Sequence, residues 1–91
     1  MAARNITYSI RIKRSAEKEM DQLPAKVFQA ARSAILNLET TPRPEGSKKL
    51  RGFDKCRLRL GDDRILYTID DLARIVEIMA IGHRKDVYRG L

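Results

Sequence analysis

Three arginines in the second half of the chain have the types and spacing of a phosphate-binding cluster. Apolar and polar residues alternate over two short stretches: Cys56, Leu58 and Leu60 with Arg57 and Arg59, then Ile65, Tyr67 and Ile69 with Arg64, Leu66 and Thr68. This alternation predicts the two strands of a hairpin. A two-residue turn at positions 62 and 63 pairs Leu60 with Ile65, so that the apolar side chains share one face and the arginines the other.

Like charges side by side on a sheet are unfavourable unless an anion offsets their repulsion. The planar guanidinium fork donates two hydrogen bonds at once, which suits the oxygens of a phosphate. The cluster of Arg57, Arg59 and Arg64 therefore favours phosphate binding. The alternative is a solvated polar face without a ligand.

A second polar group follows Gly82, which we expect to end a strand. If the tail turns into a helix, Arg84 and Tyr88 lie one turn apart on the same face. A tyrosine can stack on a base or hydrogen-bond to a phosphate oxygen. Alternatively, Tyr88 covers the end of the sheet with its ring, and we expect Val87 to be buried.

The elements that position these residues follow from hydrophobic periodicity. The predicted order is a strand at 7–13, a helix capped by Ser15, a second helix from Pro24 to about Glu39, a loop at 40–47, and strands at 56–60, 64–69 and 75–81. The last strand is apolar on nearly both faces, so we expect it inside the sheet and covered on both sides. We expect Phe53 to plug the core. The fold class is two-layer α+β: an N-terminal strand, a helical hairpin on one face of the sheet, and an antiparallel meander of the last three strands with a short C-terminal tail or helix.

Composition limits the possible functions. The 91 residues suit a single domain, 1–91, and the formal net charge of +7 indicates an anionic partner, with nucleic acid favoured over a membrane surface or an acidic protein. One cysteine and one histidine are too few for a zinc site of these ligands, and we expect no metal and no cofactor. The single cysteine is typical of a cytoplasmic protein, and no apolar run is long enough to span a membrane.

In combination, these features resemble the RelE/ParE superfamily of type II toxins, and within it the RelE branch. The resemblance covers most of the chain and rests on the order of elements and on these residues: Lys48, Lys49, Leu50, Arg51 and Gly52 before the 56–60 strand, then Arg64, Ile65, Leu66 and Tyr67, and finally Ile81, Gly82, His83 and Arg84 with Tyr88. The resemblance implies a toxin that cuts mRNA in the ribosomal A site without metal, until a cognate antitoxin wraps it.

The resemblance also implies roles for individual residues. Arg57 and Arg59 would act at the scissile phosphate, Arg64 and Arg84 would stabilise its charge, and Tyr88 would orient the base or the leaving group. Lys48, Lys49, Arg51 and Lys85 would contact RNA or the ribosome.

The general base is left open, because several mRNA-cutting relatives carry lysines where this chain has Arg57 and Arg59. A guanidinium keeps its proton and is a poor base. The base could be Lys48, Lys49, Lys85 or His83, or the ribosome and substrate could assist; we favour a structural role for His83. Two other functions stay open, a ParE-like inhibitor of DNA gyrase and a basic RNA-binding domain without catalysis. The cationic face and the grooves beside the long helix are the surfaces we expect an antitoxin to use.

Overall fold

A five-stranded mixed sheet forms the framework of the computed structural model, which describes residues 7–52 and 54–88. The strands are β1 (Ser9–Ile12), β2 (Ser47–Lys49), β3 (Cys56–Leu60), β4 (Asp63–Asp70) and β5 (Ile75–His83). Their order across the sheet is β1-β5-β4-β3-β2. Strand β1 pairs in parallel with β5, and all other neighbours are antiparallel. Strands β3, β4 and β5 therefore form the predicted meander.

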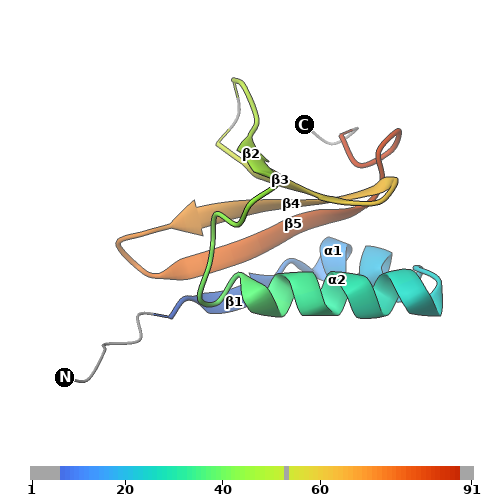
Figure 1. Cartoon of the computed structure of the whole chain (residues 1–91), viewed down its shortest axis with the longest axis horizontal. Coiled ribbons are helices and arrows are strands. Elements are labelled where there is room, and N and C mark those ends of the chain that lie inside the picture. Colours follow the sequence, from blue (N-terminus) through green and yellow to red (C-terminus); the bar gives the residue numbers. More distant parts are fainter. Residues whose placement is uncertain (1–6, 53, 89–91) are drawn as a thin grey trace.

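Two helices form the second layer, α1 (Arg14–Asp21) and α2 (Ala25–Asn37). Both lie on the same side of the sheet, and the C-terminal tail lies on the other side (Figure 1). Pro24 stands immediately before the first turn of α2, where its missing N–H and fixed φ are tolerated. The predicted helical hairpin and two-layer α+β fold are confirmed.

The core lies between this helical layer and the sheet. Ala31, Ile35 and Leu38 of the α2 segment are buried against Ile65 and Tyr67 of β4, together with Val76, Ile78 and Ile81 of β5. These side chains follow the helical period in the first segment and strand alternation in β4. In β5 the alternation is interrupted between Ile78 and Ile81, where the pairing with β4 shifts by one residue. Burial of apolar area fixes which face of each element points inward.

Strand β5 extends past the end of β1, and a helix side chain satisfies its backbone there. Strand β1 ends at Ile12, which pairs with Ile78. Beyond that point the N–H of Ile81 donates to Glu19 Oε1 at 3.0 Å. Since an unpaired N–H buried in a sheet is costly, Glu19 of α1 fastens the helical layer to the strand that leads into the tail.

Several sequence-based predictions of local structure are wrong. Residues 47–49 form the edge strand β2 rather than extending the loop, because they pair with β3. Ser15 is not the cap of α1: the cap position is Lys13, and no side chain hydrogen-bonds there. Gly82 does not end β5, which continues to His83. Phe53 lies outside the described residues.

Strand β5 is internal, between β1 and β4, as predicted, and its two faces are covered unequally. Its buried residues Val76, Ile78 and Ile81 belong to the core under the helices, whereas Glu77 and Met79 are only half-buried. Along the described part of the chain, no helix is long and apolar enough to cross a membrane.

Candidate functional site

The hairpin of β3 and β4 places the three arginines on the face of the sheet that points away from the helices. Cys56, Leu58 and Leu60 pack against the core, so Arg57 and Arg59 point to the opposite face. The register differs from the prediction by two residues: Leu58 pairs with Ile65, Arg59 with Arg64, and the turn is Gly61–Asp62. A shift of two residues preserves the faces of both strands, and Arg59 now lies directly opposite Arg64.

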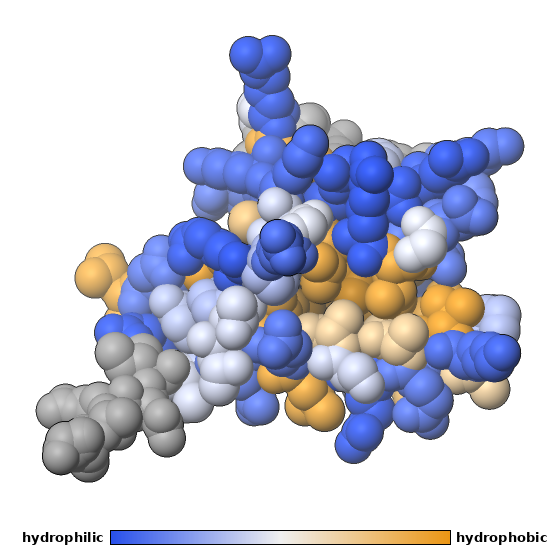
Figure 2. Space-filling model, in the orientation of Figure 1, coloured by the Kyte–Doolittle hydropathy of each residue, from blue (hydrophilic) through white to orange (hydrophobic). Residues whose placement is uncertain are grey.

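Strand β2 separates the two lysines that precede the hairpin. Lys48 pairs with Arg57, so it extends the arginine face, whereas Lys49 pairs with Cys56 and belongs to the helix side. We call Lys48, Arg57, Arg59, Arg64 and Arg84 the basic cluster. Figure 2 shows hydrophilic side chains gathered over β2 and β3, above an apolar area next to α2.

Arg64 is buried in the basic cluster, and its side chain holds the hairpin turn. The residue is 8% exposed. Its Nη1 donates to the carbonyl oxygens of Gly61 and Asp63, both at 2.9 Å. Arg64 therefore has a structural role that the sequence did not indicate, and other guanidinium donors remain for an anion.

Arg84 is exposed, and its backbone is fixed to the same turn. Its N–H donates to the carbonyl oxygen of Asp62 at 2.9 Å. The next residues form one turn, in which the N–H groups of Asp86 and Val87 donate to His83 O. This turn brings Tyr88, which is half-buried, back beside the sheet, and it buries Val87 as expected.

The remaining predicted residues occupy different positions. Lys85 is exposed in the tail, and its N–H donates to His83 Nδ1 at 3.1 Å, so the imidazole caps the turn. Arg51 is exposed after β2, on the surface that Lys49 also lines. The fold thus places Lys48 in the basic cluster and leaves Lys49 and Arg51 outside it.

Arg57 has a buried donor that lacks an acceptor. Its Nε is the buried side-chain polar atom without a hydrogen-bond partner among residues 7–52 and 54–88. A buried unsatisfied donor costs about 1–3 kcal/mol, so most buried polar atoms in proteins have a hydrogen-bond partner. The donor sits at the centre of the cluster, between the β2 and β4 neighbours of Arg57.

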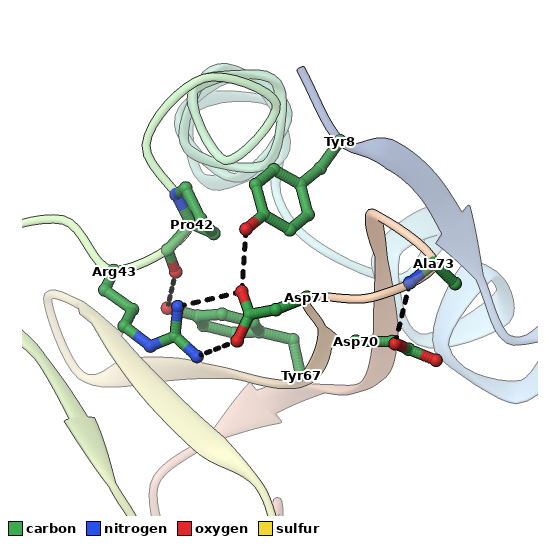
Figure 3. A network of polar contacts seen from close by, with 7 residues as sticks. All are labelled: Tyr8, Pro42, Arg43, Tyr67, Asp70, Asp71 and Ala73. Atoms are coloured by element: carbon green, nitrogen blue, oxygen red, sulfur yellow. Dashed lines mark hydrogen bonds and ion pairs between the residues drawn. The ribbon is translucent and has the colours of Figure 1, made fainter. Parts of the chain in front are cut away.

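The sequence analysis missed a polar network at the other end of the sheet (Figure 3). Arg43 binds the carboxylate of Asp71 through two hydrogen bonds, of 3.2 and 2.9 Å. The hydroxyl of Tyr8 donates to the same carboxylate at 2.7 Å, and that of Tyr67 to Pro42 O at 2.9 Å. The residues are distant in sequence, so no local pattern could have revealed the network.

This network shifts the pKa of its groups. The bonds from Arg43 and then Tyr8 lower the pKa of Asp71 to about 2. The hydrogen bond to Asp71 raises the pKa of Tyr8, and burial raises the pKa of Tyr67. The network joins the 40–46 loop to the β4–β5 turn and β1, so it has a structural function.

Cys56 has no sign of activation. It lines a cavity of about 380 Å³ with Arg43, Lys49 and Lys55. Burial raises the pKa of its thiol although two of these cations oppose the shift. A nucleophilic thiol needs a lowered pKa, so Cys56 is a packing residue. Within the described ranges, no three His, Cys, Asp or Glu side chains are grouped to hold a metal ion.

The fold and the basic cluster define a class of small toxins. A family described as the ParE toxin of the type II toxin-antitoxin system parDE matches residues 10–88. The chain therefore belongs to this family, within the RelE/ParE superfamily.

The named relatives are RelG and RelE1 toxins, and several of the similar solved structures are of RelE or RelBE proteins. The chain is 31% identical over 86 residues to the toxin RelG of Mycobacterium tuberculosis, covering 90% of this chain and 97% of the relative. It is 28% identical to a chain of the RelBE2 toxin-antitoxin complex of that organism, with a TM-score of 0.77. The match covers 87% of this chain and all of the other. For the RelE-RelB complex of Pyrococcus horikoshii the identity is 26%, the TM-score 0.79, and the coverage 89% and 99%.

Proposed function

We propose that this toxin inhibits translation by cutting mRNA on the ribosome, through attack of the RNA 2′-OH on the adjacent phosphate. The observation that carries the proposal is the basic cluster, with a buried unpaired Arg57 Nε donor and Arg59 opposite Arg64. Phosphate oxygens would accept hydrogen bonds from the guanidinium groups of the cluster and offset their mutual repulsion. Relatives named RelG and putative toxin RelE1 support this choice over other functions of the superfamily.

RNA supplies its own nucleophile, so the protein has to align it, move protons and stabilise negative charge. In this proposal Arg57 and Arg59 bind the scissile phosphate, and Arg84 stabilises its growing charge. Removing one electrostatic donor from such a site typically costs about 2.7–4 kcal/mol of barrier. Tyr88, half-buried in the tail that follows Arg84, stacks on a base or contacts the leaving group.

Lys48 is the general base we favour. It is the cross-strand partner of Arg57 on the arginine face, and an amine can lose its proton whereas a guanidinium cannot. Lys49 lies on the other face, and His83 Nδ1 accepts a backbone hydrogen bond in the tail.

The experiment is to map mRNA 5′ ends after brief expression of wild type, Arg84→Ala and Arg32→Ala in cells without the antitoxin. Arg84 is exposed in the cluster, and Arg32 is an exposed arginine of α2 in the other layer. We expect cuts within translated frames for wild type and Arg32→Ala, and their loss in Arg84→Ala. Growth arrest without cuts would favour a gyrase inhibitor, and no arrest would favour a binding domain without catalysis.

We further propose that the cognate antitoxin inserts an acidic, partly apolar segment at the free edge of β1. A groove of about 400 Å³ beside this edge is lined mostly by apolar side chains, among them Ile12, Phe28 and Leu36. Charged side chains line it as well: Glu17, Asp21 and Arg32. Ile12 is 37% exposed and Leu36 is 46% exposed. The N–H groups of Ser9 and Lys13 point to β5, so by alternation those of Ile10 and Ile12 point to the open edge.

An added strand would satisfy these N–H groups while its side chains fill the groove. The net charge of +7, with Arg11, Lys13 and Arg14 exposed in and after β1, favours an acidic partner over a second copy of this chain. The similar M. tuberculosis and P. horikoshii structures are toxin-antitoxin complexes, which supports an antitoxin as the occupant.

A further inference from the structure

The turn between β3 and β4 offers three consecutive carbonyl oxygens to the two arginines nearest to it. Gly61 O and Asp63 O accept from Arg64 Nη1, each at 2.9 Å. The oxygen between them, Asp62 O, accepts from the N–H of Arg84, also at 2.9 Å. One short segment of backbone is therefore in contact with residues that are 20 positions apart in the sequence.

The turn has this shape because of Gly61. Leu60 pairs with Asp63, which leaves Gly61 and Asp62 as the two central residues. Gly61 has a φ of +64°, and Asp62 is not among the described residues with positive φ. A positive φ at the first central position alone is the pattern of a type II′ turn, which favours glycine there.

We propose that Gly61 is a positioning residue of the RNA-cleaving site. Its backbone conformation shapes the turn from which the carbonyls at 61 and 63 hold the Arg64 guanidinium. The carbonyl at 62 continues the β4–β5 ladder to the Arg84 N–H, so the turn fixes the Arg64 guanidinium relative to the Arg84 backbone. The guanidinium is planar and rigid, so holding one of its nitrogens on two oxygens fixes the whole group. This inference rests on the function proposed above.

The surroundings of Gly61 allow a clean test. A Cβ atom built on Gly61 meets nothing within 4 Å, so a side chain there changes the backbone without a clash. Gly46 is a matched control, since its φ is +93° and its Cβ would also meet nothing within 4 Å. Gly46 lies in the loop before β2, and among the hydrogen bonds of the described residues none joins an arginine of the basic cluster to the Gly46 carbonyl.

The experiment measures cleavage of mRNA on programmed ribosomes by wild type, Gly61→Val, Gly61→Ala, Gly61→Asn and Gly46→Val, at a temperature where each is folded. We expect Gly61→Val to lower kcat about 100-fold with little change in KM, because a displacement of about 1 Å can cost that much. Gly61→Ala should show a smaller loss of the same kind. Gly61→Asn should recover most of the activity because asparagine tolerates positive φ, and Gly46→Val should stay within about threefold of wild type.

Amide hydrogen exchange supplies a second readout that does not need activity. The Arg84 N–H should be protected in wild type and in Gly46→Val, and should lose protection in Gly61→Val. If wild type cleaves and Gly61→Val cleaves equally well, or if Arg84 stays protected in Gly61→Val, the inference is overturned. If wild type itself does not cleave on ribosomes, the proposed function fails, and the inference fails with it as a statement about catalysis.

Discussion

The carboxylate of Asp71 is the group whose charge state most clearly affects the fold. It accepts hydrogen bonds from Arg43 and Tyr8, and its pKa is lowered from 3.8 to about 2. A lowered folded-state pKa means that the contribution to stability is complete above pH 3.8 and is lost as the pH falls towards 2. This contribution is therefore constant at physiological pH.

We predict that wild type and Asp71→Asn differ in urea midpoint at neutral pH, and that the difference shrinks between about pH 4 and pH 2. Both side chains of the Arg43–Asp71 pair are more than half exposed, at 56% and 54%, so the difference should be modest. Glu45→Gln, in the same loop, is the control and should follow wild type. A difference that does not depend on pH would show that the charge of Asp71 is unimportant.

Arg64 and Arg84 should respond differently to truncation although both carry the same charge. Arg64 is buried and bonded to two turn carbonyls, so Arg64→Ala should lower the free energy of unfolding by about 1–3 kcal/mol. The side chain of Arg84 is exposed, so Arg84→Ala should change the free energy of unfolding by less than about 0.5 kcal/mol. Urea unfolding followed by circular dichroism measures both. Equal stability of the two variants would refute the structural role of Arg64. Because Arg84→Ala should leave the fold stable, it is the better of the two variants for testing catalysis.

At the scale of elements, helix α2 buries one face in the core and exposes the other, so that two adjacent residues near its end have opposite surroundings. Ile35 is 3% exposed and Leu36 is 46% exposed. Ile35→Ala should therefore cost about 2–4 kcal/mol through lost burial and a residual cavity, whereas Leu36→Ala should cost less than about 1 kcal/mol. Thermal or urea unfolding of the pair checks this. Similar losses for both would mean that α2 packs on the sheet through a different face.

The proposed binding of the antitoxin at the free edge of β1 and its groove can be tested with a matched pair of leucine substitutions. Leu36 lines the groove, and Leu72, which is 99% exposed in the β4–β5 turn, does not. We predict that Leu36→Glu weakens antitoxin binding at least tenfold, because it puts a charge into an apolar site facing an acidic segment. Leu72→Glu should bind like wild type in calorimetric titration. Unchanged binding by Leu36→Glu would place the antitoxin elsewhere, and messenger cleavage should be unaffected in both variants.

At the scale of the whole molecule, the two layers carry different surfaces. The face away from the helices gathers Lys48 and the arginines, whereas α2 has a largely apolar inner side and scattered charges outside. The basic cluster therefore concentrates positive charge on the face where we expect a single strand of RNA to bind.

We predict that binding of a 2′-O-methyl RNA, which has no nucleophile, weakens with salt. For single strands the slope of log affinity against log salt is about −0.7 per neutralised phosphate. Arg59→Gln should make the slope shallower by about 0.7, and Lys26→Gln, on an exposed position of α2, should leave it unchanged. Fluorescence anisotropy at several salt concentrations gives the slopes. Equal slopes for Arg59→Gln and wild type would exclude this face as the RNA surface.

The sequence by itself determined the order of the elements, apart from the edge strand β2, and the faces that β3 and β4 present. Period-two alternation in 56–60 and 64–69 and the helical period before them depend only on which side chains avoid water, so they are visible locally. The arginine face was predicted correctly even though the register was off by two residues, because an even shift leaves the alternation unchanged.

Only the tertiary structure decided the pairing partners. Whether Lys48 or Lys49 joins the arginine face depends on the pairing of β2 with β3. The sequence did not reveal this pairing, because two prolines and a glycine immediately before residue 47 indicate a loop. The bonds of the Gly61–Asp63 carbonyls to Arg64 and Arg84, and of Asp71 to Arg43 and Tyr8, join chain segments through specific hydrogen bonds. Hydrogen-bond geometry depends on distances between folded segments, and these distances exist only once the sheet and the helices have packed together.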